Sequence, residues 1–351
     1  MIYHVFELDH PYELHRLIIR SFLSLEDNNE IKDKQSFIII EKKVNAAREI
    51  KKLFNEKGDK IKIINKLSKK ELSKLIDKND NIILHGISYK AIFQLVLYNL
   101  APLHYVCWGS GTRINKNFQS VISYPFKLFI YKKQKNIITL LDGDKKDLNK
   151  YFGLINVSTL SYPSYKTKEE LLLYDQLKGD NYERIIYVGN SGHSIDYYFR
   201  SLDIIAPLKK DFDEIHYMLQ YGINHESDEF IRFKKQADKI FGEKLFIDID
   251  YLNFTDYLKY MSRCTTYICP SPVQTGLGAI SNCLRMGKKV YAIGKNFERY
   301  RNMGCVIFDY NNIYKTFLEI LTDSQIKYNK QVLSNYNKKE QWISFLNDIS
   351  E

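Results

Sequence analysis

Strand-like and helix-like segments alternate along this chain, and the alternation occurs twice. Short apolar runs typical of strands lie in the first half at residues 2–7, 36–41, 61–64, 81–85 and 104–108. Helical patterns separate these runs. A second set of strand-like runs, also separated by helical patterns, lies at 184–188, 214–218, 245–248, 265–269 and 289–293. Strands that alternate with helices predict parallel sheets covered on both faces, so we predict an α/β protein with two Rossmann-like domains.

The length agrees with two domains, because 351 residues exceed what one hydrophobic core usually holds. The pattern is interrupted near NVSTLSYPSYKTKEE, where Pro163 and small polar residues stand. We therefore predict a first domain over 1–163 and a second over 164–351. A helical pattern from Asp323 to about Asn347 follows, and whether the last helix crosses back to the first domain is left open.

Several protein classes do not fit the composition. No window is long and apolar enough to span a membrane, and MIYHVFELDH predicts a first strand rather than a signal peptide. The five cysteines have no spacing typical of a disulfide framework or a zinc knuckle. We expect a reduced, cytoplasmic location.

The net charge of +10 is compatible with nucleic acid, an anionic membrane or an acidic substrate as partner. Most lysines stand in helices with interleaved acids, and no nucleic-acid motif accompanies them, so we expect no nucleic-acid partner. The stretch YPFKLFIYKKQK at 124–135 differs, because it mixes large apolar side chains with lysines. It suits either a helix in a lipid headgroup layer or a core helix with a basic end.

Small polar residues and glycines gather where the predicted strands end, which is where open α/β sheets bind ligands. In the second half these loops are YVGNSGHS at 187–194, LQYGIN at 219–224 and PSPVQTGLGAI at 270–280. A capped tight turn explains one such loop, but it explains three in one domain less well. The third loop joins a strand to a helix through glycines, and such a bare turn favours the approach of an anion to the backbone.

Five segments resemble one known family in their order and spacing. They are HGISYKAIFQLVLYNLAPLHYVCWG, IIYVGNSG, YGIN, FTDYLKYMSRC and QTGLGAISNCLRMGKKVYA. Over residues 4–308 the chain is similar to the TDP-N-acetylfucosamine:lipid II N-acetylfucosaminyltransferases (4-acetamido-4,6-dideoxygalactosyltransferases). The resemblance implies a glycosyltransferase of the GT-B type, with two Rossmann-like domains facing each other across a cleft.

The resemblance also implies the substrates. The donor would be a dTDP-activated deoxyamino sugar, with a UDP-sugar as second choice. The acceptor would be a saccharide on undecaprenyl diphosphate, in O-antigen or common-antigen synthesis, at the anionic inner face of the bacterial inner membrane. The first domain would bind the acceptor and the second the donor. The donor-binding residues would be Gly189, Asn190, Ser191, Tyr221, Gly222, Gln274, Gly276 and Gly278.

A general base would have to come from the first domain, where titratable side chains stand at strand ends. Asp9 is the first choice and His85 the second, with His10 beside Asp9. A helix N-cap is the alternative role for Asp9, and holding the donor or packing under the loop are the alternatives for His85.

No metal or other cofactor is expected. The Asp-x-Asp pair Asp142 and Asp144 resembles a metal-diphosphate motif, but a capped helix start explains it, and 211–213 and 248–250 repeat the pattern. The chain departs from the family where Gly111 replaces an acid and where Asp196 and Tyr197 replace an Asn and a His. The reaction class therefore transfers more safely than the substrate.

The sequence leaves an alternative function and several properties open. An epimerase-like nucleotide-sugar enzyme without a lipid acceptor is the alternative, since twin Rossmann domains serve there as well. The nucleobase, the sugar, the acceptor, the anomeric outcome and the oligomeric state are not specified by the residues.

Overall fold

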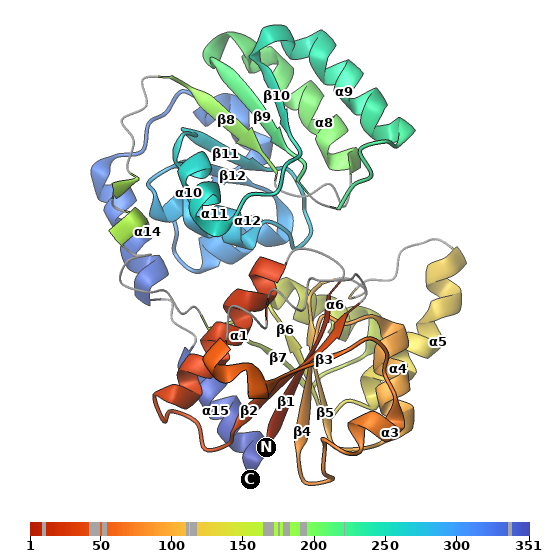
Figure 1. The fold of residues 1–351 in the computed structure, drawn as a ribbon. Coiled ribbons are helices and arrows are strands. Elements are labelled where there is room, and N and C mark those ends of the chain that lie inside the picture. The colour runs from red at the N-terminus through yellow and green to blue at the C-terminus, as the bar shows by residue number, and fades with distance from the viewer. Residues whose placement is uncertain are drawn as a thin grey trace. The chain divides into compact units, whose positions relative to one another are not determined.

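The computed structural model describes residues 1–8, 12–41, 50, 55–109, 112, 118–163, 172–174, 176–177, 183–189, 195–220, 222–335 and 339–351. The chain forms two compact units (Figure 1). Unit 1 comprises Met1–Tyr165 and Asn337–Glu351, and unit 2 comprises Lys166–Tyr336. Each unit contains one parallel sheet, which confirms the predicted α/β class with two Rossmann-like domains.

Unit 1 is built on a seven-stranded sheet of order β3-β2-β1-β4-β5-β6-β7, in which every pair is parallel. Its strands are β1 (Ile2–Leu8), β2 (Gln35–Glu41), β3 (Ile61–Ile64), β4 (Asn81–His85), β5 (Leu103–Cys107), β6 (Asn136–Thr139) and β7 (Val157–Thr159). Its helices are α1 (Tyr12–Asp27), η1 (Asn55–Lys60), α3 (Lys69–Leu72), α4 (Tyr89–Tyr98), α5 (Phe118–Lys132), α6 (Asp142–Phe152) and α15 (Lys339–Ser350).

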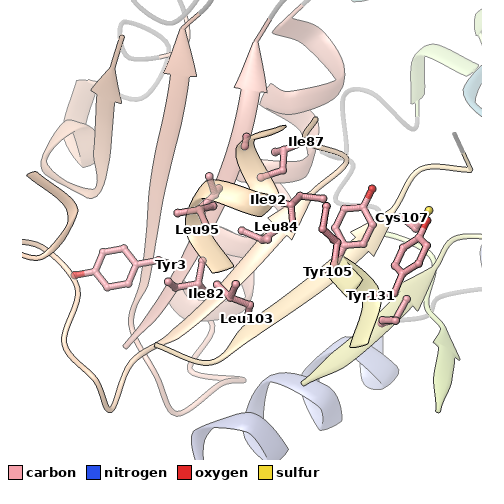
Figure 2. Close-up of a cluster of buried hydrophobic side chains, with 14 of the residues drawn as sticks. Tyr3, Ile82, Leu84, Ile87, Ile92, Leu95, Leu103, Tyr105, Cys107 and Tyr131 are labelled. Carbon is pink, nitrogen blue, oxygen red and sulfur yellow. The ribbon is translucent and has the colours of Figure 1, made fainter. Parts of the chain in front are cut away.

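Two hydrophobic layers cover the faces of this sheet. Because successive side chains of a strand point to opposite faces, Phe6 joins the layer of α1 and α15 while Val5 joins the layer of α4 and α5. Figure 2 shows the second layer, in which Leu84 and Tyr105 of the sheet lie near Ile92 of α4. Burial on both faces is the reason that these strands read as continuous apolar runs.

Unit 2 repeats this plan with a six-stranded parallel sheet of order β10-β9-β8-β11-β12-β13. Its strands are β8 (Ile185–Val188), β9 (Glu214–Met218), β10 (Leu245–Asp248), β11 (Thr266–Cys269), β12 (Lys289–Ala292) and β13 (Phe308–Asp309). Its helices are α8 (Ile195–Ile205), η2 (Ala206–Asp211), α9 (Asp228–Phe241), η3 (Gly242–Lys244), α10 (Phe254–Ser262), α11 (Leu277–Arg285), α12 (Gly294–Asn302), η4 (Tyr310–Asn312), α13 (Ile313–Thr316) and α14 (Asp323–Asn335).

Strand order reverses direction once in each sheet. In unit 1 the chain builds outward from β1 and then returns to place β4 beside it, and in unit 2 it returns to place β11 beside β8. Ligands of open α/β sheets bind at the carboxyl ends of the two strands that flank such a reversal. The loops after β1, β4, β8 and β11 are therefore the positions to examine.

The C-terminal helices and the domain boundary differ from the sequence-based expectation. The single terminal helical pattern from Asp323 is two helices, α14 in unit 2 and α15 in unit 1. The sequence-based domain boundary was placed after residue 163, and the structure divides the two units between Tyr165 and Lys166. Across the residues the structure describes, every helix is too short or too polar to cross a membrane.

Candidate active site

The loop after β11 turns sharply into helix α11, which begins at Leu277. Gly276 makes the turn with φ +65° and ψ 17°, in the left-handed region that favours glycine. No side chain caps this helix, and its first turn contains no acidic residue. The N–H groups of this turn therefore meet no carboxylate from the first turn itself, which suits an anion site.

Gly278 lies in that first turn and is exposed. A Cβ at this position would meet no heavy atom within 4 Å, so open space stands in front of the backbone. A phosphate group can approach the helix start here without displacing any described side chain.

The first turn of helix α12 (Gly294–Asn302) forms hydrogen bonds with residues 271–273 of the same loop. Asn296 is fully buried, and its Nδ2 donates to the carbonyl oxygens of Val273 at 2.9 Å and Ser271 at 3.3 Å. The backbone N–H of Lys295 donates to Pro272 O at 3.1 Å. The path of 271–273 is therefore fixed by a neighbouring helix rather than by the loop itself.

Gln274 follows directly, and its Oε1 is buried without a hydrogen-bond partner among the described residues. Leaving a buried polar atom unpaired costs about 1–3 kcal/mol, so such an atom points to a missing partner. A half-turn of the amide exchanges its oxygen and nitrogen, so this side chain can present either an acceptor or a donor to a ligand.

The structure brings several of the predicted donor residues to one edge of the sheet. Gly189 follows β8, adopts φ +72°, and donates its N–H to Ile268 O of β11 at 2.8 Å. Gly222 follows β9, and Gln274, Gly276 and Gly278 follow β11. Because these strands are parallel neighbours, all these residues lie at the carboxyl edge. The predicted donor residues outside the described part of the chain are Asn190, Ser191 and Tyr221.

In unit 1 the predicted bases Asp9 and His10 also lie outside the described residues, directly after β1. The nearest described carboxylate in sequence is that of Glu7, which is already engaged. It accepts from the N–H of Ser88 at 2.7 Å and from Ser88 Oγ at 3.1 Å, at the N-cap of α4. Glu7 therefore stabilises a helix start, where a carboxylate is favoured.

His85 ends β4 and is buried, and both of its ring nitrogens have partners inside unit 1. Its Nε2 lies 2.8 Å from His4 Nδ1, and its Nδ1 lies 2.7 Å from the hydroxyl of Tyr162. The same hydroxyl accepts from Trp108 Nε1 at 2.7 Å. We refer to Gln35, His4, His85, Tyr162 and Trp108 as the buried polar chain.

The proton positions along the buried polar chain can be deduced from Gln35, because its amide orientation is fixed by a backbone hydrogen bond. Gln35 Nε2 donates to Asp33 O at 2.7 Å, so Gln35 Oε1 faces His4 Nε2, which lies 2.6 Å away and must carry a proton. His4 Nδ1 then accepts from His85 Nε2, and His85 Nδ1 accepts from Tyr162. Every donor has one acceptor when both rings are neutral.

The pKa values agree with neutral rings. Burial lowers the pKa of His4 to about 4, against a weaker opposing effect of its hydrogen bond with Gln35. Burial, followed by the neighbouring His4 and His15, holds the pKa of His85 well below its usual range. Burial also raises the pKa of Tyr162. No member of the buried polar chain is ionised near neutral pH.

This geometry does not support the prediction that His85 contacts substrate as a base, because it has no ring nitrogen left to accept a proton. His85 therefore fits the structural alternative weighed from the sequence, packing at the strand end, and this role stays a prediction. It orients Tyr162 and through it the indole of Trp108. Gly86 gives the indole of Trp108 the space it occupies, because a Cβ at residue 86 would lie 2.3 Å from Trp108 Cδ2. Its φ of +57° also favours glycine.

Asp142 and Asp144 occupy the first turn of α6. Asp144 is fully buried and accepts from Thr112 Oγ1 at 3.4 Å. The described residues of the chain contain no group of three or more His, Cys, Asp or Glu side chains placed to hold a metal ion.

Two Rossmann-like units, each with ligand-type loops at its strand reversal, are the architecture of the GT-B glycosyltransferases. The family model described as 4-alpha-L-fucosyltransferase, glycosyl transferase group 56, matches residues 1–348. The chain belongs to this family, which confirms the resemblance drawn from its motifs, and it is a glycosyltransferase.

Solved structures agree on the fold at low sequence identity. A glycosyltransferase from Rickettsia africae is 15% identical with a TM-score of 0.70, over 99% of this chain and 98% of that one. Anabaena HepE in complex with UDP and glucose is 11% identical with a TM-score of 0.66, over 99% and 97%. A Neisseria meningitidis UDP-GlcNAc 2-epimerase is 12% identical with a TM-score of 0.59, over 99% of both chains. No curated protein matches the chain.

Proposed function

We propose that this glycosyltransferase moves a deoxyamino sugar, of the N-acetylfucosamine kind, from a dTDP-sugar to a lipid-linked saccharide in bacterial surface polysaccharide synthesis. A UDP-sugar is the second choice of donor. Membership of the fucosyltransferase family supports a deoxy sugar. The observation that carries the donor site is the uncapped start of α11 at the strand reversal of unit 2.

The chemistry of the donor asks for such a site. Transfer breaks the bond between the anomeric carbon and the diphosphate, so negative charge grows on the leaving oxygen. N–H groups at the first turn of α11, held in place before the reaction, stabilise that charge where it develops. The amide of Gln274 adds a donor beside them. Removing one such donor typically costs about 10²–10³ in rate.

Unit 2 is then the donor domain, as predicted for the second half of the chain. Asn190 and Ser191 after β8 would complete the polar wall, and Tyr221 with Gly222 after β9 would border the nucleoside. The described neighbours Gly189 and Gln274 support this assignment, because both stand at the carboxyl edge of the sheet.

Unit 1 is the acceptor domain in this proposal, and Asp9 is its base. Asp9 is the residue after β1 ends at Leu8, at the strand reversal of unit 1. Glu7 is engaged at the start of α4 and His85 is enclosed in the buried polar chain, so neither competes for the role. Asp9 would take the proton of the attacking hydroxyl as the new bond forms.

The acceptor implies a location. A saccharide on undecaprenyl diphosphate is held at the inner face of the bacterial inner membrane, so the enzyme would act as a peripheral protein on that anionic surface. The net charge of +10 favours such a surface electrostatically.

A panel of nucleoside diphosphates tests the donor. A ligand present at 100 times its Kd stabilises the folded protein by about 2.7 kcal/mol, which a thermal unfolding scan resolves. We expect dTDP to give the largest shift, UDP the next, and GDP and ADP the smallest. Equal shifts for all four would contradict a pyrimidine donor.

Product analysis tests the transfer itself. The purified enzyme with a dTDP-deoxyamino sugar should convert a lipid-linked saccharide to a product one sugar heavier, detected by mass spectrometry. Conversion of the donor sugar without any acceptor would instead be epimerase chemistry, which the shared fold alone does not distinguish.

A further inference from the structure

The outer face of helices α4 and α5 is apolar where it meets solvent. On α5, Ile122, Phe126 and Phe129 have exposed fractions of 61%, 39% and 40%, and their spacing of four and three residues places them on one stripe. On α4, Leu97 is 60% exposed. Large apolar side chains gathered in this way on a soluble domain mark a contact surface.

Phe93 joins the two helices into one patch. Its ring centroid lies 5.0 Å from that of Phe126 and 6.2 Å from that of Phe129, and Leu97 follows it one turn later on α4. We refer to Phe93, Leu97, Ile122, Phe126 and Phe129 as the α4–α5 patch.

Both helices of the α4–α5 patch carry lysines, and both lack acidic residues. Helix α4 carries Lys90, and the run from Phe118 to Lys135 contains four lysines with no Asp or Glu. They are Lys127, Lys132, Lys133 and Lys135. The ammonium group of Lys127 lies 5.3 Å from the ring centre of Tyr89, and the other three are exposed.

A groove of about 500 Å³ opens at the end of the patch. Lys78, Lys133 and Lys135 line it, together with apolar side chains such as Val96 and Leu100. Lys133 connects groove and patch, because its Nζ lies 5.8 Å from the ring centre of Phe129. The groove combines ammonium donors with apolar side chains, which suits an anionic lipid headgroup and its first methylenes.

We propose that the α4–α5 patch and its lysine-lined groove dock on an anionic lipid bilayer. Phenylalanine and leucine side chains enter the interface while the lysines meet lipid phosphates. A second copy of the chain is the weaker occupant, since a symmetric contact would place these lysines against each other with no acid on either helix. The proposal rests on the lipid-linked acceptor of the proposed function and names the surface that holds the enzyme near it.

Vesicle co-sedimentation tests the surface with three variants. The first is Lys132→Glu with Lys133→Glu and Lys135→Glu, and the second is Phe126→Ser with Phe129→Ser. The matched control is Lys234→Glu with Lys235→Glu and Lys239→Glu on α9 of unit 2, which changes the net charge equally. The vesicles contain phosphatidylcholine with or without about one-third phosphatidylglycerol.

We expect the parent and the control to bind the phosphatidylglycerol vesicles and not the neutral ones. Loss of each surface lysine costs about fivefold in membrane affinity, so the triple variant at 132–135 should bind roughly 100-fold more weakly. The double Ser variant should lose binding as well. A triple variant at 132–135 that binds like the control would overturn the proposal.

A Phe126→Trp reporter adds a direct readout. Its fluorescence should shift to shorter wavelength when phosphatidylglycerol vesicles are added, because the indole leaves water. A shift that depends on protein concentration instead of vesicles, with a dimer in sedimentation that the Ser variant abolishes, would assign the patch to a second copy and overturn the bilayer.

A short-chain, water-soluble acceptor separates this inference from the proposed function. If the patch variants lose vesicle binding but transfer normally to that acceptor, both proposals stand. Vesicle binding by the parent without transfer to any lipid-linked saccharide would refute the proposed function and leave the surface intact.

Discussion

At Gly278 the stability of α11 and the binding of the proposed ligand have opposite requirements. A Cβ there meets no described atom within 4 Å, and alanine is preferred over glycine in a helix by up to about 1 kcal/mol. We expect Gly278→Ala to unfold at slightly higher urea concentration and yet to bind nucleoside diphosphate more weakly. Gly278→Val should weaken binding further, because the larger valine side chain would occupy the space proposed for the phosphates. Calorimetric titration measures both, and a folded Gly278→Val with parental affinity would move the diphosphate elsewhere.

Gln274 should matter more for turnover than for binding. Its Oε1 is buried without a hydrogen-bond partner among the described residues, and the charge that the side chain would face grows as the sugar leaves. We expect Gln274→Ala to lower kcat by about 10²-fold while the Kd of the nucleotide changes only a few-fold. Steady-state kinetics with calorimetry separates the two effects. Equal losses in affinity and kcat/KM, with kcat unchanged, would make Gln274 a simple binding residue.

The buried histidines of unit 1 make the protein acid-sensitive. The pKa of His4 is lowered to about 4 and that of His85 is lowered well below the unfolded value near 6.5. Above pH 6.5 both states are neutral and the histidines have no effect. As the pH falls from 6.5 toward 4, only the unfolded chain takes up protons, so stability falls by up to about 1.4 kcal/mol per pH unit for each histidine.

A variant isolates this contribution. His85→Gln keeps a hydrogen-bonding side chain but does not titrate, so its free energy of unfolding should decline less steeply between pH 6.5 and 4 than that of the parent. Urea unfolding at several pH values gives the two slopes, with His225→Gln as control because His225 lies outside the buried polar chain. Parallel slopes for parent and His85→Gln would mean that His85 is protonated in the folded state.

The loops proposed to bind the donor could be picked out from the sequence because each signal is local. Gln274, Gly276 and Gly278 are neighbours in the chain, and a bare turn between a strand and a helix is visible without a structure. The hydrogen bonding of His85 could not be predicted in this way. Its partners His4 and Tyr162 are 81 and 77 residues away, so the hydrogen bonds that neutralise it exist only once the sheet is formed.

Among elements, the ten predicted strands all have counterparts, because strands buried on both faces are continuous apolar runs. Strands β7 and β13 were missed, and they have only three and two residues. Strand β6, with four residues, was not among the ten either. A two- or three-residue strand at a sheet edge has too little apolar pattern to stand out from a loop.

The division of the terminal helical pattern into α14 and α15 was not predicted. Whether the last helix joins the first domain was left open, because hydrophobic periodicity does not say which core a helix joins. Helix α15 contributes Trp342, Leu346 and Ile349 to the core of unit 1. Trp342 is fully buried, and its Nε1 donates to Ser161 O at 2.8 Å. Its ring is stacked on that of Tyr162, with centroids 5.9 Å apart.

Trp342→Ala should therefore destabilise unit 1 although it lies near the end of the chain. Truncating a buried aromatic side chain costs about 3–5 kcal/mol. We expect hydrogen exchange, read by mass spectrometry, to accelerate in peptides of β1, β2 and α1 and to stay unchanged in those of β8 and β11. Ile320→Ala, at a side chain that is 87% exposed, is the control and should change neither set. Faster exchange in unit 2 alone would contradict the assignment of α15.

At the scale of the whole molecule, nucleotide binding and membrane binding are assigned to different compact units. The proposed diphosphate site uses the backbone of α11 in unit 2, and the α4–α5 patch lies in unit 1. The two sites share no residue, so substitutions in them should act additively, as distant and independent sites do.

A double dissociation tests this separation. Gly278→Val should lose nucleoside diphosphate binding and keep the parental affinity for phosphatidylglycerol vesicles. The variant with Lys132→Glu, Lys133→Glu and Lys135→Glu should bind nucleotide like the parent and lose the vesicles. Transfer to a lipid-linked acceptor in vesicles requires both sites, so each variant should be slow there. Transfer to a short soluble acceptor requires only the first, so the lysine variant alone should recover parental rates. If the lysine variant is equally slow on both acceptors while its nucleotide affinity is intact, those lysines act in acceptor binding itself rather than in holding the enzyme on the bilayer.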